Sequence, residues 1–177
     1  MSQNSGSQPF DVRYEDSGDL PVFVDHFLAN TIENGIYLAM ATNLPIRDPK
    51  AEQVASVHAT LYLPLDAVSA LHALAENFRL HVGGGTAAFS QEAVALRFDR
   101  PRSDVPVLAD FFNCKGVPNG VHLSVGRMST STPNLAVVFA TYQLSNATML
   151  KLHWLTTQIM GLVRPPPGYP TGSHSSH

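Results

Sequence analysis

The chain has 177 residues, of which 44% are hydrophobic and only 14% are charged. This length fits one ordinary domain or two very small ones and excludes a large multi-domain enzyme. The formal net charge of −3 argues against a general binder of nucleic acid or of anionic membranes, because both functions need a basic surface. The charged fraction is well below the usual value of about 25%, which suggests that a partner or another subunit covers part of the surface.

The single cysteine, Cys114, excludes an intramolecular disulfide framework and a cysteine-rich zinc site. No hydrophobic run approaches the roughly 20 residues that span a bilayer. Residues 1–10 have neither the basic start nor the hydrophobic stretch of a secretory signal. We therefore expect a cytoplasmic protein without membrane insertion.

The chain contains an internal duplication. Residues 18–39 align with residues 103–124 at an offset of 85, with 8 identities in 22 positions. Residues 55–74 align with residues 136–155 at an offset of 81, with 8 identities in 20 positions. Chance would give only a few identities, so each half of the chain should contain the same elements in the same order.

The first copy predicts four strands and a helix. A short strand is expected at residues 12–14, and a strand rich in Val and Phe at 22–28. Asn34-Gly35 predicts a tight turn, because both residue types tolerate a positive φ angle. Alternating hydrophobic residues from Ile36 onward predict a half-buried strand. After a polar loop at 43–52, a longer strand is expected, with Val57, Ala59, Leu61 and Leu63 on one face.

The second copy repeats this pattern. Strands are expected at residues 94–98 and 107–113, followed by a turn at Asn119-Gly120 and an alternating strand from Val121. A loop at 127–134 precedes the last strand, in which Val138, Ala140, Tyr142 and Leu144 are expected on one face.

A helix is predicted to close each copy. Pro64 suits the first turn of the first helix, and Ser145 or Asn146 is a natural N-cap of the second. Leu71 and Leu152 are expected to be buried at matched positions. The two hydrophobic stripes consist of Val68, Leu71, Ala75 and Phe78 in the first helix and of Met149, Leu152, Thr156 and Ile159 in the second.

These elements predict an α+β fold made of two repeated β-rich units, each closed by one C-terminal helix and related by a pseudo-two-fold axis. The expected boundaries are a disordered N-terminus at 1–9, unit 1 at 10–80, a Gly-rich linker at 81–92, unit 2 at 93–163, and a flexible tail rich in Pro, Gly and Ser at 164–177.

The order of strand, strand with a variable loop, strand and Pro-initiated helix resembles a family of short bacterial proteins classed as a domain of unknown function. The matching segments are Val24-Asp25-His26 and residues 59–78, ATLYLPLDAVSALHALAENF. The second copy departs from the pattern, because Ser145 replaces the proline. The resemblance covers residues 22–78 well and the second half loosely. It implies an architecture and not a chemistry, because the family has no assigned activity.

His72 and His153 occupy matched positions on the two predicted helices. Two histidines that meet could bind a metal or an anion, or could sense pH. A metal site needs three or four ligands, however, and no Asp or Glu recurs beside them. We therefore favour packing of each ring at a helix–sheet or helix–helix border.

Asp25 and Asp110 also recur. A pair of carboxylates could act as acid and base. Their neighbours in the predicted strands are hydrophobic, so an outward-facing Asp, or one that caps a turn, explains the recurrence more simply. Two further matched residues, Asp19 and Asp104, each stand two positions before a proline and predict a turn at the start of a strand.

Cys114 lies close in sequence to Asp110 and His122, which raises the possibility of a thiol nucleophile. The first copy has Ala29 at this position, so we expect a small buried side chain there instead. Residues 83–85 are three glycines without a phosphate-binding pattern around them. Residues 166–169 read PPGY and match the short motif of WW-type domains, but so short a motif recurs easily by chance.

We predict a non-catalytic protein-binding or assembly module built from a fused pseudo-dimer, because fusion of the two subunits of a symmetric dimer would produce such a duplication. The alternative is a small-molecule or metal-binding sensor or enzyme with a site at the interface between the repeats. We expect a protein partner or self-association and no nucleic acid. No catalytic residue, metal or cofactor is assigned. The features that recur belong to the scaffold, whereas reactive groups such as Cys114 and His26 occur in one copy only.

Overall fold

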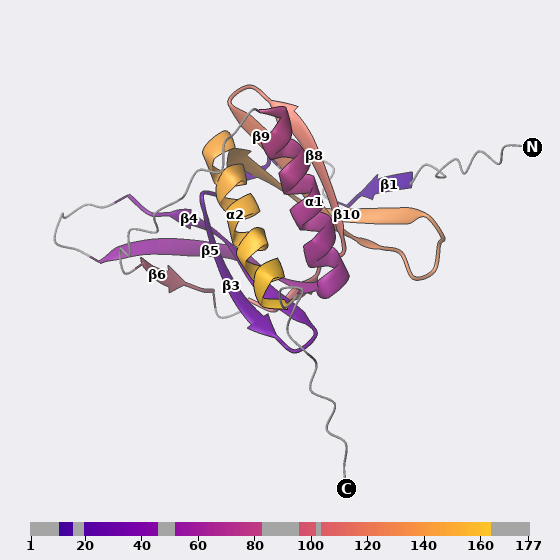
Figure 1. Ribbon diagram of the computed structural model, residues 1–177, viewed down its shortest axis with the longest axis horizontal. Coiled ribbons are helices and arrows are strands. Elements are labelled where there is room, and N and C mark those ends of the chain that lie inside the picture. Colours follow the sequence, from indigo (N-terminus) through magenta and orange to yellow (C-terminus); the bar gives the residue numbers. More distant parts are fainter. Residues whose placement is uncertain (1–10, 16–19, 46–51, 83–95, 102–103, 164–177) are drawn as a thin grey trace, which may run out of the picture.

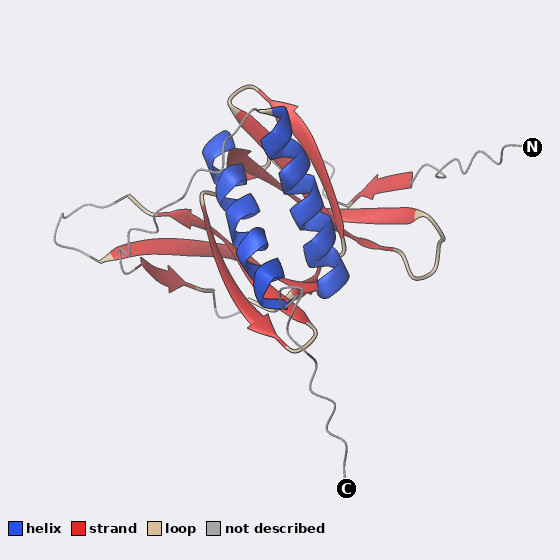
Figure 2. Ribbon diagram, in the orientation of Figure 1, coloured by secondary structure: helices blue, strands red, loops and turns tan. Residues whose placement is uncertain are grey.

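Two curled β-sheets and a pair of helices make up the protein, for which we analysed a computed structural model. It describes residues 11–15, 20–45, 52–82, 96–101 and 104–163. Figure 1 shows the two helices side by side across the strands, with the long strands projecting past them on opposite sides. Figure 2 shows the same arrangement by type of secondary structure.

The predicted fold class is wrong. The structure is mostly β, with 53% strand and 26% helix, and it is more β-rich than the expected α+β fold of two units related by a pseudo-two-fold axis. The expectation failed because each sheet takes strands from both halves of the chain. Alternating hydrophobicity predicts that a segment is a strand, but it does not say which strand lies next to it.

One sheet has three antiparallel strands from the first half and two short parallel strands from the second half. We call it the first-half sheet. Its strands are β3 (His26–Ile32), β4 (Gly35–Asn43), β5 (Gln53–Pro64), β6 (Leu96–Asp99) and β7 (Val107–Leu108). β6 and β7 both pair with the outer side of β5.

The second-half sheet has the reciprocal composition. Two short strands from the first half lie parallel to the last strand of an antiparallel trio from the second half. Its strands are β1 (Asp11–Tyr14), β2 (Val22–Phe23), β8 (Phe111–Val117), β9 (Gly120–Met128) and β10 (Leu135–Ser145). The halves have thus exchanged their short N-terminal strands.

The chain passes from one sheet to the other between two consecutive residues, Val24 and Asp25. The Val24 amide donates to Gln143 O of the second-half sheet at 3.0 Å, and the next amide, of Asp25, donates to Ala41 O of the first-half sheet at 3.1 Å. The single strand predicted at 22–28 is therefore two strands in different sheets. The strand predicted at 107–113 is divided in the same way, with the break between Ala109 and Asp110.

Each hairpin turn lies one residue earlier than predicted, at residues 33–34 and 118–119, and Gly35 and Gly120 are the first residues of β4 and β9. Gly35 and Gly120 do not adopt a positive φ angle; a Cβ atom at either position would overlap the carbonyl oxygen of Leu63 or Leu144 on the neighbouring strand. Of the four turn residues, Asn119 alone has a positive φ, 66°. It follows Pro118, in the order that a type II turn favours.

Helices α1 (Leu65–His81) and α2 (Asn146–Val163) each follow directly from the last strand of a trio. Pro64 is the N-cap residue of α1. The Ser145 hydroxyl accepts a hydrogen bond from the Thr148 amide at 3.1 Å and caps α2 as predicted. Neither helix is long and hydrophobic enough to cross a membrane.

The main hydrophobic core lies between the helices and the two sheets. The predicted stripe residues Leu71 and Leu152 are both buried in it, together with the crossing residues Val24 and Ala109. Residues 1–9, most of the expected 81–92 linker and the 164–177 tail lie outside the described residues, as do the first two residues of the strand predicted at 94–98.

Truncation of either leucine should create a cavity at the helix–sheet contact. We expect Leu71→Ala and Leu152→Ala each to lower the free energy of unfolding by about 2–5 kcal/mol. Leu80 is 63% exposed at the end of α1, so Leu80→Ala should change it by less than about 0.5 kcal/mol. Urea denaturation of the three variants measures this difference, and equal losses would contradict the assigned core.

Candidate functional site

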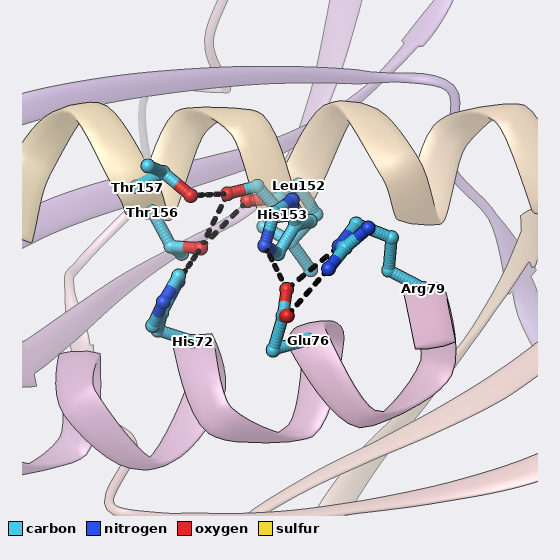
Figure 3. Close-up of polar contacts among 7 residues, drawn as sticks. All are labelled: His72, Glu76, Arg79, Leu152, His153, Thr156 and Thr157. Carbon is cyan, nitrogen blue, oxygen red and sulfur yellow. Dashed lines mark hydrogen bonds and ion pairs between the residues drawn. The ribbon is translucent and has the colours of Figure 1, made fainter. Parts of the chain in front are cut away.

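A cluster of polar side chains lies where α1 crosses α2, and we call it the histidine cluster (Figure 3). It consists of His72, Glu76 and Arg79 from α1 and His153 and Thr156 from α2. The helices run antiparallel here, because His72 contacts Thr156 while Glu76 contacts His153. The two imidazole rings stack with their centroids 5.3 Å apart and their planes 22° from parallel.

His72 is held by a chain of hydrogen bonds. Its Nδ1 lies 3.1 Å from the Thr156 hydroxyl, which donates to the carbonyl oxygen of Leu152 at 3.0 Å. A threonine hydroxyl has a single proton, and that proton is used on the helix backbone. The ring and the hydroxyl therefore form one chain of polar contacts that ends on the helix backbone.

Glu76 connects the two helices. One of its carboxylate oxygens lies 2.6 Å from His153 Nε2, and both oxygens accept hydrogen bonds from Arg79, at 2.6 and 2.8 Å. The bidentate Arg79 pair holds the carboxylate in place. Its hydrogen bond is the main reason why the pKa of Glu76 falls to about 2.

The pKa of His72 is shifted in the direction that favours a neutral ring. Partial burial lowers it most, the nearby His153 lowers it further, and Glu76 raises it. At neutral pH the stack therefore contains an uncharged His72 beside a His153 that is paired with a carboxylate. Protonation of His72 would place a positive charge in a partly buried site.

The structure brings the predicted residues His72 and His153 together at a helix–helix border. Glu76 and Arg79 were missed by the sequence reasoning. Residues 72, 76 and 79 share one face of a helix, which is a signal that could have found them. The matched positions of the second helix are Thr157 and Met160, so the acid and the base come from one helix only.

The stacked rings do not form a metal centre with other ligands. Within the described ranges, no group of three or more His, Cys, Asp or Glu side chains is arranged to hold a metal ion. The Nδ1 of His72 and the Nε2 of His153 already have protein partners.

Asp25 and Asp110 occupy the two crossings between the sheets. The Asp25 carboxylate accepts a hydrogen bond from the Asn43 amide at 2.8 Å, and the Asp110 carboxylate accepts one from the Met128 amide at 2.6 Å. Asp25 also contacts His26 Nδ1 at 2.8 Å. Each carboxylate thus satisfies the backbone at the end of a neighbouring strand. In the described part of the chain, the two do not contact each other as an acid–base pair would.

Asp104, predicted at a turn, caps a sheet edge. Its carboxylate accepts hydrogen bonds from the Thr60 amide at 3.0 Å and the Thr60 hydroxyl at 2.5 Å. Thr60 lies on β5 between the stretches that pair with β6 and β7. The matched Asp19 lies outside the described residues.

The Cys114 thiol is unsuited to nucleophilic attack. It is half-buried on β8, and burial raises its pKa to about 11. A thiol with so high a pKa stays protonated at neutral pH, whereas the thiolate is the nucleophile.

Two matched hydrophobic segments are exposed instead of buried. We call residues 20–23 the LPVF segment and residues 105–108 the VPVL segment. The first residue of each is highly exposed, Leu20 at 89% and Val105 at 72%. Phe23 and Leu108 at their ends remain 46% and 41% exposed, although they pair with β10 and β5.

The chain was also compared with protein-family models, with curated proteins and with solved structures, and none of them matched. The resemblance to a bacterial family of unknown function therefore remains a prediction.

The histidine cluster should make stability depend on pH. Because the pKa of His72 is lower in the folded protein than its ordinary value of 6.5, the unfolded chain binds more protons below that pH. The stabilising contribution is complete above pH 6.5 and is lost as the pH falls through the folded pKa. Glu76 adds a second loss between pH 4.5 and about 2.

We expect His72→Gln to reduce the difference in free energy of unfolding between pH 7.5 and pH 5.5, measured by urea denaturation at each pH. The control is His81→Gln, at an exposed position at the end of α1. An unchanged pH dependence in His72→Gln would contradict the assigned role of the ring.

Removal of either crossing carboxylate should leave a backbone amide without its acceptor. We expect Asp25→Ala and Asp110→Ala each to cost about 1–3 kcal/mol of the free energy of unfolding. Glu33→Ala, at an exposed position in the β3–β4 turn, should be close to neutral. Thermal unfolding followed by circular dichroism tests this, and a neutral result at both aspartates would refute the capping role.

Proposed function

We propose that the protein is a non-catalytic protein-binding or assembly module and that the LPVF and VPVL segments are its contact points. The observation that carries the proposal is the exposure of these two hydrophobic segments at matched positions. Single exposed hydrophobic residues are common on protein surfaces. Here, however, each half presents several consecutive ones around a proline, and contiguous hydrophobic patches mark interaction sites.

The prolines prepare both segments for binding. Proline fixes its own φ angle and keeps the preceding residue extended, so Leu20 and Val105 are restricted before a partner arrives. Less conformational entropy is then lost on association. Full burial of a side chain of this size contributes about 1.5–3 kcal/mol.

Two equivalent segments on one chain support bivalent binding. A partner that engages both gains affinity, because its second contact becomes intramolecular. The low charged fraction of the chain, 14%, agrees with a surface that is partly covered in its working state.

The alternative of a sensor or enzyme at the interface between the halves has less support. The groups that converge there are the members of the histidine cluster, and they are hydrogen-bonded to one another. Because these side chains already bind one another, the cluster is better suited to holding the two helices together than to binding a ligand.

The test is affinity purification with quantitative mass spectrometry from the cells that express the chain. We expect a stoichiometric protein partner with the wild type, and a loss of affinity of roughly 10-fold or more for Leu20→Ser or Val105→Ser, as expected for about 1.4 kcal/mol or more of lost burial. The double variant should lose more than either single one.

The matched control is Leu80→Ser, which changes a leucine that is also exposed but lies on α1. It should keep the partner. A partner retained by the Leu20 and Val105 double variant would disprove the assigned contact points. Purification of the wild type with a bound metabolite and without a protein would overturn the binding-module proposal.

A further inference from the structure

Each sheet has a seven-residue strand at one end, β3 in the first-half sheet and β8 in the second-half sheet, and two short strands at the other end. Within the described part of the chain, β3 pairs only with β4, and β8 pairs only with β9. Figure 1 shows β3 beside α2 and β8 beside α1. Both strands therefore have one backbone edge without a strand partner.

The hairpin loops show which backbone groups face these edges. Each loop has two residues, between the paired residues Ile32 and Gly35 and between Val117 and Gly120. The pair that flanks a two-residue loop exchanges hydrogen bonds, and this pattern alternates along an antiparallel ladder. The amide and carbonyl groups of Ala29 and Thr31 on β3, and of Cys114 and Gly116 on β8, thus point to the free edges.

The β8 edge is protected against another strand. The Cys114 amide, which points to this edge, donates to the side-chain oxygen of its neighbour Asn113 at 2.9 Å. Lys115 follows directly on the same strand. A lysine on an edge strand and an edge amide that is already occupied are both devices that prevent strand addition.

The β3 edge has neither device. At an offset of 85, Asn113 corresponds to Leu28, and Lys115 corresponds to Asn30. Residues 26–32 contain no Asp, Glu, Lys or Arg, and Asn30, Thr31 and Ile32 at the end of the strand are all exposed. α2 contacts β3, but it leaves these three residues accessible.

We propose that the β3 edge binds the β3 edge of a second copy of this chain, so that two first-half sheets join across a two-fold axis. An uncharged strand can pair antiparallel with itself without placing like charges opposite each other, which would be unfavourable. In this pairing, the free amide and carbonyl groups of each β3 strand find their hydrogen-bond partners on the β3 strand of the other copy, which has the same length.

Of the two seven-residue edge strands, β3 alone is open, and this limits the assembly that can form through them. A two-fold contact uses the same surface on both copies and closes as a dimer. If both edges were open, chains could add without limit. Protection of β8 therefore favours a closed dimer over a row of copies joined through β3 and β8. This interface is separate from the LPVF and VPVL segments and does not depend on the function proposed for them.

The experiment compares proline at matched edge positions of the two strands. Thr31→Pro removes an amide that points to the β3 edge and leaves the β3–β4 ladder complete. Proline is tolerated at such positions on an edge strand. Gly116→Pro makes the same change on β8, where an added side chain meets no atom within 4 Å. Sedimentation equilibrium over a 100-fold concentration range measures the oligomeric state of each.

We expect a concentration-dependent dimer for the wild type and for Gly116→Pro, and at least a 10-fold weaker dimer for Thr31→Pro. Thr31→Lys, which keeps the backbone donor and adds a charge, should weaken the dimer as well. If circular dichroism shows that Thr31→Pro is unfolded, the dimer affinity of Thr31→Lys decides the test.

A wild type that stays monomeric, or a dimer that survives both Thr31 variants, would overturn the inference. So would a different protein that occupies the β3 edge of a monomer and is lost with Thr31→Lys. The Leu20→Ser and Val105→Ser double variant should still dimerise, so that failure of the proposed contact points and failure of the dimer are distinguishable.

Discussion

The fold depends on two places where the backbone leaves one sheet and joins the other within one peptide step. Between Val24 and Asp25, and again between Ala109 and Asp110, successive amides donate to different sheets. Val24 and Ala109 are completely buried, so the crossings lie inside the core, where every backbone polar group needs a partner. Those partners exist only when both sheets are present. Neither half of the chain can therefore complete its own sheet, and the duplicated halves form one cooperative structure instead of two linked units.

The helix pair joins the two halves a second time, and its contact combines two kinds of interaction. Hydrophobic residues such as Leu71 and Leu152 pack into the common core, and the stacked histidines lie among polar partners at the border between the helices. The matched positions of Glu76 and Arg79 are Thr157 and Met160. After duplication, the halves thus kept the packing on which the fold depends, while only one helix carries the acid and the base that orient the other helix. The same divergence separates the two edge strands, of which β8 is protected and β3 is open.

Local features could be predicted from the sequence because they depend on residues that are close in the chain. Alternating residues indicated β4 and β9, the stripes indicated both helices, and the N-cap of α2 was narrowed to Ser145 or Asn146, of which Ser145 is the cap. The partner of each strand could not be predicted in this way. β2 and β7 have only two residues each, and nothing in their composition specifies β10 or β5. The recurrence of His72 and His153 placed them on equivalent helix positions, but the contact between their rings depends on which helix faces meet. Asp25 was recognised as a recurrent residue, yet its role follows from a break in a strand that the sequence predicts to be continuous.

The parallel pairing of β1 and β2 with β10 determines the order in which the protein can be completed during translation. These two strands leave the ribosome well before β10, because the other strands of both sheets lie between them in the sequence. Pairing of segments so distant in sequence is slow compared with the formation of local hairpins and helices. The nascent chain must therefore carry Tyr14, Val22 and Phe23 without a sheet until β10 emerges. A polypeptide that stops before β10 leaves β1 and β2 without the strand on which both of them pair.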